Sequence, residues 1–140
     1  MTTFKIKPKK GRFYFEVLVF DTKPEMWAYV KADKERMGIN QDSGKFGAMC
    51  ISYEIVKFDA NGAEKRKGDI GTLLFAKTQL GAGTIAHEIG HAAFHYDRLI
   101  NGNKNATYGR NIGEDEERVL YLLAEMVSDF IDKKKKKNIL

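Results

Sequence analysis

Cysteine is nearly absent from this chain of 140 residues, in which Cys50 stands alone. A single cysteine excludes an internal disulfide framework and a zinc site built from several thiolates. Long apolar runs are also missing, so no segment could cross a membrane, and residues 1–7 lack the apolar region of a signal peptide. We therefore expect a soluble, cytoplasmic protein without a membrane partner, with Cys50 as a small core residue on a strand.

Internal repeats and low-complexity linkers are absent as well, which predicts one domain spanning residues 1–140. The contents of hydrophobic (43%) and charged (31%) residues are ordinary for a globular protein. The net charge of +5 is local, because it arises from the lysine run at 133–137. We interpret residues 133–140 as a frayed, solvated tail, and a nucleic-acid or acidic-partner contact is the lesser alternative.

Apolar periodicity and turn residues predict an α+β fold with a small mixed or antiparallel sheet. Strands are expected at residues 4–7, 12–20, 46–58 and 69–78, and helices at 24–38, 84–100 and 114–133. Turn residues at 8–11 and 59–62 predict two hairpins, the second with a solvated basic arm at 65–67. The sheet is expected to pack on the second and third helices.

The most informative stretch contains the pattern His-Glu-x-x-His, with His87, Glu88 and His91 in an otherwise apolar helix. Because positions i and i+4 of a helix share one face, both imidazoles can point at a single metal ion. A catalytic zinc ion takes three protein ligands and leaves one position for water, which Glu88 could reach as general base. The alternative is a core helix with hydrogen-bonded histidines. Thr84 is expected to cap the helix.

The third zinc ligand is sought in His95 and in the acidic residues 114–117. Eight helical residues separate His95 from His87, a rise of about 12 Å that is too long for one ion. On the last helix, Glu116 lies about 20° from the centre of the apolar face and Glu117 about 120° away. Glu116 is therefore preferred and Glu117 is second. The alternative is that these acids only favour the positive end of the helix dipole.

Two further roles are expected around this site. The strand before the helix could pair with an extended substrate peptide, with Leu73, Leu74 and Phe75 at its edge, unless that strand lies inside the sheet. A tetrahedral oxyanion also needs a hydrogen-bond donor besides the metal. Tyr108, Tyr96 and His95 are the candidates for that donor.

The motif at 87–91, followed by a later apolar helix that opens with Glu116 and Glu117, resembles the single-domain zincins. It is similar to the ImmA/IrrE-type metallopeptidases and to small zincin-like proteins of phages and prophages. Aligning the family's apolar-Ala-Glu-apolar-apolar run with residues 123–127 places its metal ligand at Glu116, whereas a Glu-x-x-x-Tyr-Leu pattern places it at Glu117. The resemblance implies a zincin-like fold, Zn²⁺ as cofactor and a protein or peptide substrate.

These residues predict a zinc metallopeptidase in which His87 and His91 bind the metal and Glu88 is the general base. The first alternative is a catalytically silent zincin-fold protein that binds a partner in a phage–host or regulatory interaction. The second alternative is a protein that contacts nucleic acid through the lysines at 133–137.

Overall fold

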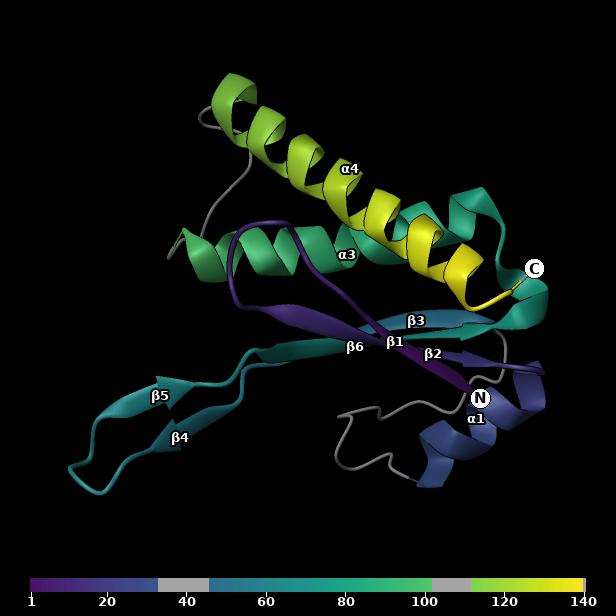
Figure 1. Ribbon diagram of the computed structural model, residues 1–140, viewed down its shortest axis with the longest axis horizontal. Coiled ribbons are helices and arrows are strands. Elements are labelled where there is room, and N and C mark those ends of the chain that lie inside the picture. Colours follow the sequence, from purple (N-terminus) through teal and green to yellow (C-terminus); the bar gives the residue numbers. More distant parts are fainter. Residues whose placement is uncertain (33–45, 102–111, 140) are drawn as a thin grey trace.

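The computed structural model describes residues 1–32, 46–101 and 112–139 (Figure 1). These residues form a four-stranded sheet in the order β1-β2-β6-β3, a separate two-stranded ribbon and helices on both faces of the sheet. The expected α+β class with a small mixed sheet is confirmed. Among the described helices, none combines the length and apolar character that a membrane-spanning segment requires.

The chain begins with an antiparallel hairpin, as its sequence predicts. Strand β1 (Thr2–Ile6) pairs with β2 (Tyr14–Phe20) in a continuous register. Phe4 and Ile6 of β1 are buried and Lys5 between them is exposed, because successive side chains of a strand point to opposite faces. The second half of β2 is buried on both faces because an apolar cluster covers each face of the sheet there.

Strand β6 (Asp69–Ala76) is the second interior strand and leads into the motif helix. It pairs in parallel with β2 and antiparallel with β3 (Ala48–Ser52). The short 3₁₀ turn η1 (Lys77–Gln79) then connects β6 to α3 (Ala82–Ile100). Because β3 runs antiparallel to β6, α3 begins near the start of β3 and follows that strand to its end.

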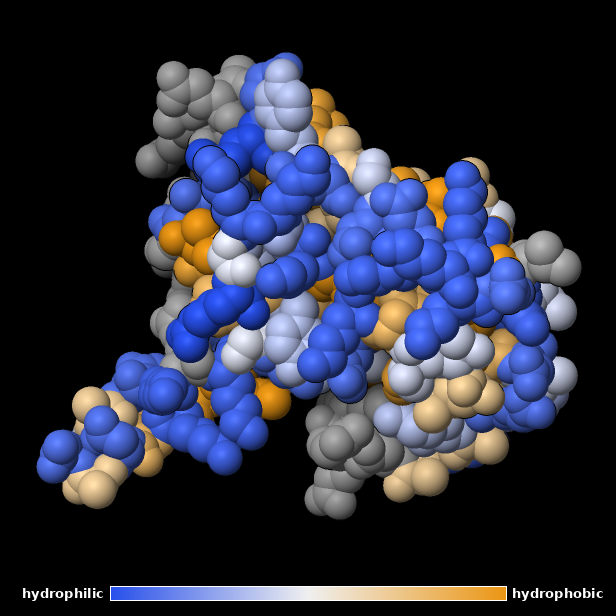
Figure 2. All heavy atoms as spheres, viewed as in Figure 1, coloured by the Kyte–Doolittle hydropathy of each residue, from blue (hydrophilic) through white to orange (hydrophobic). Residues whose placement is uncertain are grey.

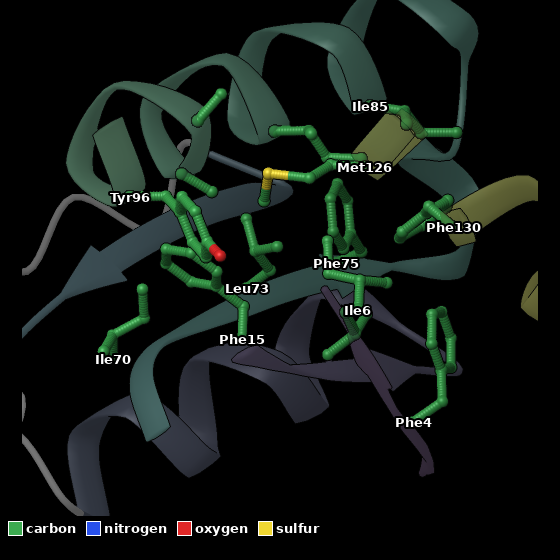
Figure 3. Packing of buried hydrophobic residues seen from close by; sticks show 14 of the residues in the cluster. Phe4, Ile6, Phe15, Ile70, Leu73, Phe75, Ile85, Tyr96, Met126 and Phe130 are labelled. Atoms are coloured by element: carbon green, nitrogen blue, oxygen red, sulfur yellow. The ribbon is translucent and has the colours of Figure 1, made fainter. Parts of the chain in front are cut away.

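Helices cover both faces of the sheet. Helices α3 and α4 (Ile112–Lys136) lie on one face and α1 (Lys23–Ala32) lies on the other (Figure 1). In the larger core, Phe75 of β6 meets Phe130 of α4 with ring centroids 5.2 Å apart (Figure 3). In the smaller core, Trp27 of α1 packs in one cluster with Leu74. The sheet is therefore buried between two apolar layers.

The stretch predicted as one strand at 46–58 forms two strands in two different sheets. Strand β3 pairs with β6, whereas β4 (Val56–Phe58) pairs with β5 (Glu64–Arg66) in the ribbon. The expected turn is confirmed, because Asp59 accepts hydrogen bonds from the backbone of Asn61 and Ala63. Apolar residues alternate in both β3 and β4, because side chains alternate in any extended strand. The sequence pattern therefore does not mark the point between them where the chain changes sheets.

The lysine run is helical, so the prediction of a frayed tail is wrong. Helix α4 continues through Lys136, and Ile139 beyond it is buried. Lys133 Nζ donates hydrogen bonds to the Lys5 carbonyl and to Asp129 Oδ2. Cations are favourable at a helix C-terminus, and these contacts add tertiary support to it. The expected helix at 24–38 is seen as far as Ala32, and its remaining residues lie outside the described ranges.

Candidate functional site

Helix α3 positions the His-Glu-x-x-His residues beside the edge of the sheet. Its buried face includes Ile85, Ile89 and Ala92, spaced so that one stripe packs on the core. The helix begins after Gly81, whose extended backbone is the N-cap without a side-chain hydrogen bond. The prediction that Thr84 caps the helix is therefore wrong, because Thr84 already lies in the first turn.

The imidazoles of His87 and His91 lie side by side outside the core. Both side chains are exposed, their Nε2 atoms are 3.3 Å apart, and their rings are nearly perpendicular at 87°. Two nitrogens that each lie about 2.0–2.1 Å from one tetrahedral zinc ion are about 3.3–3.4 Å apart. This pair therefore fits two positions in the coordination sphere of a zinc ion.

Glu88 faces β3 from the same stretch of the helix. Burial raises the pKa of its carboxyl above the ordinary value, while charges on His87 and His91 and a backbone hydrogen bond from Cys50 lower it. The carboxylate is thus held against the strand, next to the two imidazoles. Such a group can accept a proton from a water molecule located between itself and a bound metal ion.

An open groove of about 440 Å³ separates the histidines from β3. The groove is lined by residues of both elements, among them Ala48, Cys50, Ser52, His87, Glu88 and His91. Burial raises the pKa of the Cys50 thiol to about 12, and a contact with Ser52 acts in the opposite direction. Cys50 is therefore a neutral thiol at ordinary pH and packs against the core, as its sequence context predicts.

The free edge beside this groove belongs to β3 and not to β6. Leu73, Leu74 and Phe75, which we predicted as the substrate-binding edge, lie on a strand that is hydrogen-bonded on both sides. Their side chains are fully buried, so this prediction is wrong. An unbroken apolar run is typical of a strand that is covered on both faces. The prediction of one long strand at 46–58 did not indicate that β3 forms the edge of the sheet beside the groove.

His95 connects α3 to the end of β3. Its Nε2 atom lies 3.1 Å from the Tyr53 carbonyl, and its ring meets the edge of Phe15 at a centroid distance of 6.1 Å. Because a carbonyl oxygen only accepts, Nε2 carries the hydrogen of this bond. A transition-state role for His95 would therefore have to use Nδ1. Tyr96, the second predicted donor, is buried and donates its hydroxyl hydrogen to the Lys10 carbonyl, so it is not available to the groove. Tyr108, the third, lies outside the described residues.

Helix α4 approaches α3 from the side away from the histidines. Arg118 of α4 donates to both carboxylate oxygens of Asp97 at 2.6 and 3.0 Å, and the Asn101 side chain bonds the same carboxylate. Asp97 is only 2% exposed. Local periodicity does not indicate this contact, although an aspartate inside an apolar helix face calls for a partner.

Glu116 and Glu117 therefore do not join the histidine pair in this structure. Both side chains are exposed, and the described residues include no group of three His, Cys, Asp or Glu able to hold a metal ion. The prediction that Glu116 faces the core is wrong, because the first turns of α4 lie farthest from the sheet (Figure 1). A helical wheel gives the angular position of a residue around the helix axis. It does not show whether another element lies close to that turn of the helix.

The chain was compared with protein families, curated proteins and solved structures. No family model, curated protein or solved structure matches the chain.

Proposed function

We propose that this protein is a zinc-dependent metallopeptidase that hydrolyses peptide bonds of a protein substrate. The proposal rests on the 3.3 Å separation of the His87 and His91 Nε2 atoms, which suits two ligands of one tetrahedral zinc ion. Glu88 lines the same groove, where such an enzyme needs its general base. The resemblance of the motif to the zincins supports the same reaction.

In the proposed reaction Glu88 accepts a proton from the attacking water and delivers it to the leaving amine. The backbone hydrogen bond from Cys50 orients its carboxylate, and partial burial excludes competing water from one side. A bound zinc ion would supply a Lewis acid that polarises the scissile carbonyl and lowers the pKa of water.

The edge of β3 is the proposed place for the substrate backbone. Among the described strands β3 pairs only with β6, and residues of β3 line the groove that contains His87 and Glu88. An extended peptide can add to such an edge through main-chain hydrogen bonds. This arrangement would hold the peptide in the groove beside the histidines.

The third ligand is proposed to come from the start of α4, with Glu116 preferred over Glu117. The resemblance of the motif and the later helix to the zincins supports this choice, and the zinc content of single variants tests it. Loss of zinc in only one of the variants Glu116→Ala and Glu117→Ala would identify the ligand. Retention of zinc in both variants would exclude each as an indispensable ligand.

The first stage of the test is the metal content of the purified protein, measured by elemental analysis. We expect about one zinc ion per chain, strongly reduced in His87→Ala, as for a site with three protein ligands. His95→Ala is the matched control and should retain its zinc, because His95 is bound to Tyr53. Wild-type protein purified without chelator that holds no stoichiometric metal would overturn the proposal.

The second stage is cleavage of a peptide library by zinc-loaded protein. Glu88→Gln keeps the size of the side chain but removes its basicity, so it should retain zinc and lose activity by about 10²-fold or more. Equal cleavage by wild type and this variant would contradict the role of Glu88. Zinc binding by a wild type that cleaves no peptide would favour the silent, zincin-fold binding protein instead.

A further inference from the structure

The β4–β5 ribbon projects from the four-stranded sheet as an arm, and among the described residues it forms a sheet of its own (Figure 1). Its register places Lys57 opposite Lys65, with Val56 opposite Arg66 and Phe58 opposite Glu64. The surface of the arm is largely hydrophilic (Figure 2). A ribbon that buries so little apolar surface contributes little to the core. The core therefore places few constraints on its residues, which can be used to bind a partner.

One face of this ribbon carries three lysines. Lys57 and Lys65 form a cross-strand pair and therefore point to the same side. Lys67 follows Lys65 by two residues, and its backbone N–H continues the ladder by donating to the Ile55 carbonyl at 2.8 Å. Because side chains alternate along a strand, Lys67 shares this side. We call Lys57, Lys65 and Lys67 the lysine face.

The lysine face is electrostatically unfavourable in the isolated protein. Like charges directly opposite each other on two strands are destabilising. The side chain of Lys57 lies close enough to lower the pKa of Lys67 by contact and by its charge, although Asp69 acts in the opposite direction. Within the described residues, no ion pair joins any of these three ammonium groups to a carboxylate. A polyanion that binds this face would relieve the repulsion.

We propose that the lysine face binds the phosphate backbone of double-stranded DNA. The major groove of B-DNA admits a two-stranded β-ribbon, whereas the major groove of duplex RNA is too narrow and deep for one. The ribbon projects from the fold, so it can reach a groove of the duplex with its lysine face toward the phosphates. This role goes beyond the proposed peptidase activity and does not depend on it.

The test is binding of the full chain to a fluorescein-labelled DNA duplex of mixed sequence, followed by anisotropy from about 50 to 200 mM salt. Replacing all three lysines by glutamine should weaken binding and make the plot of log K against log salt shallower by about 2 to 3, because each lost phosphate contact removes about 0.9. These lysines lie outside the core, so circular dichroism and the melting temperature should show an intact fold.

The charge-matched control replaces Lys135, Lys136 and Lys137, which are exposed at the end of α4. We expect this variant to bind DNA with nearly the wild-type salt slope. An equal loss in both variants would show that net charge alone drives binding and would overturn the assignment to the ribbon. Absence of DNA binding by the wild type would overturn it as well.

A second pair of probes distinguishes the partner class. Duplex RNA of the same length and sequence, and poly-glutamate as a model of an acidic protein, should compete more weakly than unlabelled DNA. A different result would be that poly-glutamate competes as strongly as unlabelled DNA with the wild type and fails to bind the lysine-face variant. This result would show that the ribbon recognises acidic protein instead. Equal competition by duplex RNA would contradict recognition through the B-form major groove.

Discussion

At the scale of single residues, Asp97 decides how α3 and α4 are held together. Its carboxylate accepts a two-pronged hydrogen bond from Arg118 and a further bond from Asn101, while Arg118 remains partly exposed. A buried carboxylate with several donors depends on those donors, because its desolvation is otherwise uncompensated. The pair lies on the side of α3 opposite the groove, so its role is in packing and orientation.

Asp97→Ala should lower the free energy of unfolding by about 2–3 kcal/mol, because it removes the hydrogen-bond acceptor for two side chains. Urea denaturation followed by circular dichroism measures this change. The matched control is Asp21→Ala, which removes a surface ion pair to Lys77 at 3.6 Å and should change stability by less than about 1 kcal/mol. Equal effects of the two substitutions would contradict the structural role of Asp97.

Tyr53 predicts a pH dependence of stability at alkaline pH. Burial raises the pKa of its phenol from 10.0 to about 12, with a smaller contribution from Asp69 and an opposing one from Thr72. Between these values the unfolded chain loses this proton and the folded protein keeps it, so stability falls as the pH rises from about 10 to about 12. Tyr53→Phe removes the ionisation, so its stability should fall less steeply over this interval.

Denaturant titrations of wild type and Tyr53→Phe at several pH values through this interval measure the difference. A constant offset between the two curves is expected below the interval, because the variant also loses the bonds of Tyr53 to Asp69 and Thr72. Parallel curves throughout would show that the phenol of Tyr53 ionises alike in the folded and unfolded chain.

At the scale of elements, the pairing of β3 with β6 determines where the groove lies. At Gly71 of β6, β3 and the ring of Phe15 approach the backbone closely. A Cβ atom built there would lie 2.4 Å from the Phe15 ring and 2.7 Å from the Ile51 carbonyl oxygen. Any side chain would therefore push β3 or β2 away from β6.

Gly71→Ala should lower the free energy of unfolding by about 1–3 kcal/mol, because the new methyl group overpacks the sheet. Gly83→Ala is the control, since a Cβ there meets no atom within 4 Å and alanine favours the helix by up to about 1 kcal/mol. Thermal or urea unfolding measures both changes. A neutral Gly71→Ala would show that β3 is not held as closely to β6 as the structure indicates.

At the scale of the whole molecule, the fold places the groove and the β4–β5 ribbon next to the same strand, β3. The groove between α3 and β3 lies at one edge, and the ribbon leaves the same strand after Tyr53. The N-terminal hairpin and the order of helices follow from local periodicity and were predicted correctly. His87 and His91 lie on one face of α3, as their spacing predicts, and their metal binding stays a prediction. The split of residues 46–58 was not predicted, because alternation shows that a segment is extended but not which strand it pairs with.

The sequence by itself determined that His87 and His91 share a helix face with Glu88 between them, since the spacing is set by the helix repeat. It also determined the α+β class through its local periodicities. Tertiary structure alone decided that β3 borders the groove, that Leu73 to Phe75 are interior, and that Glu116 is exposed. These features depend on which elements meet across the fold, and periodicity within one element carries no information about its neighbours.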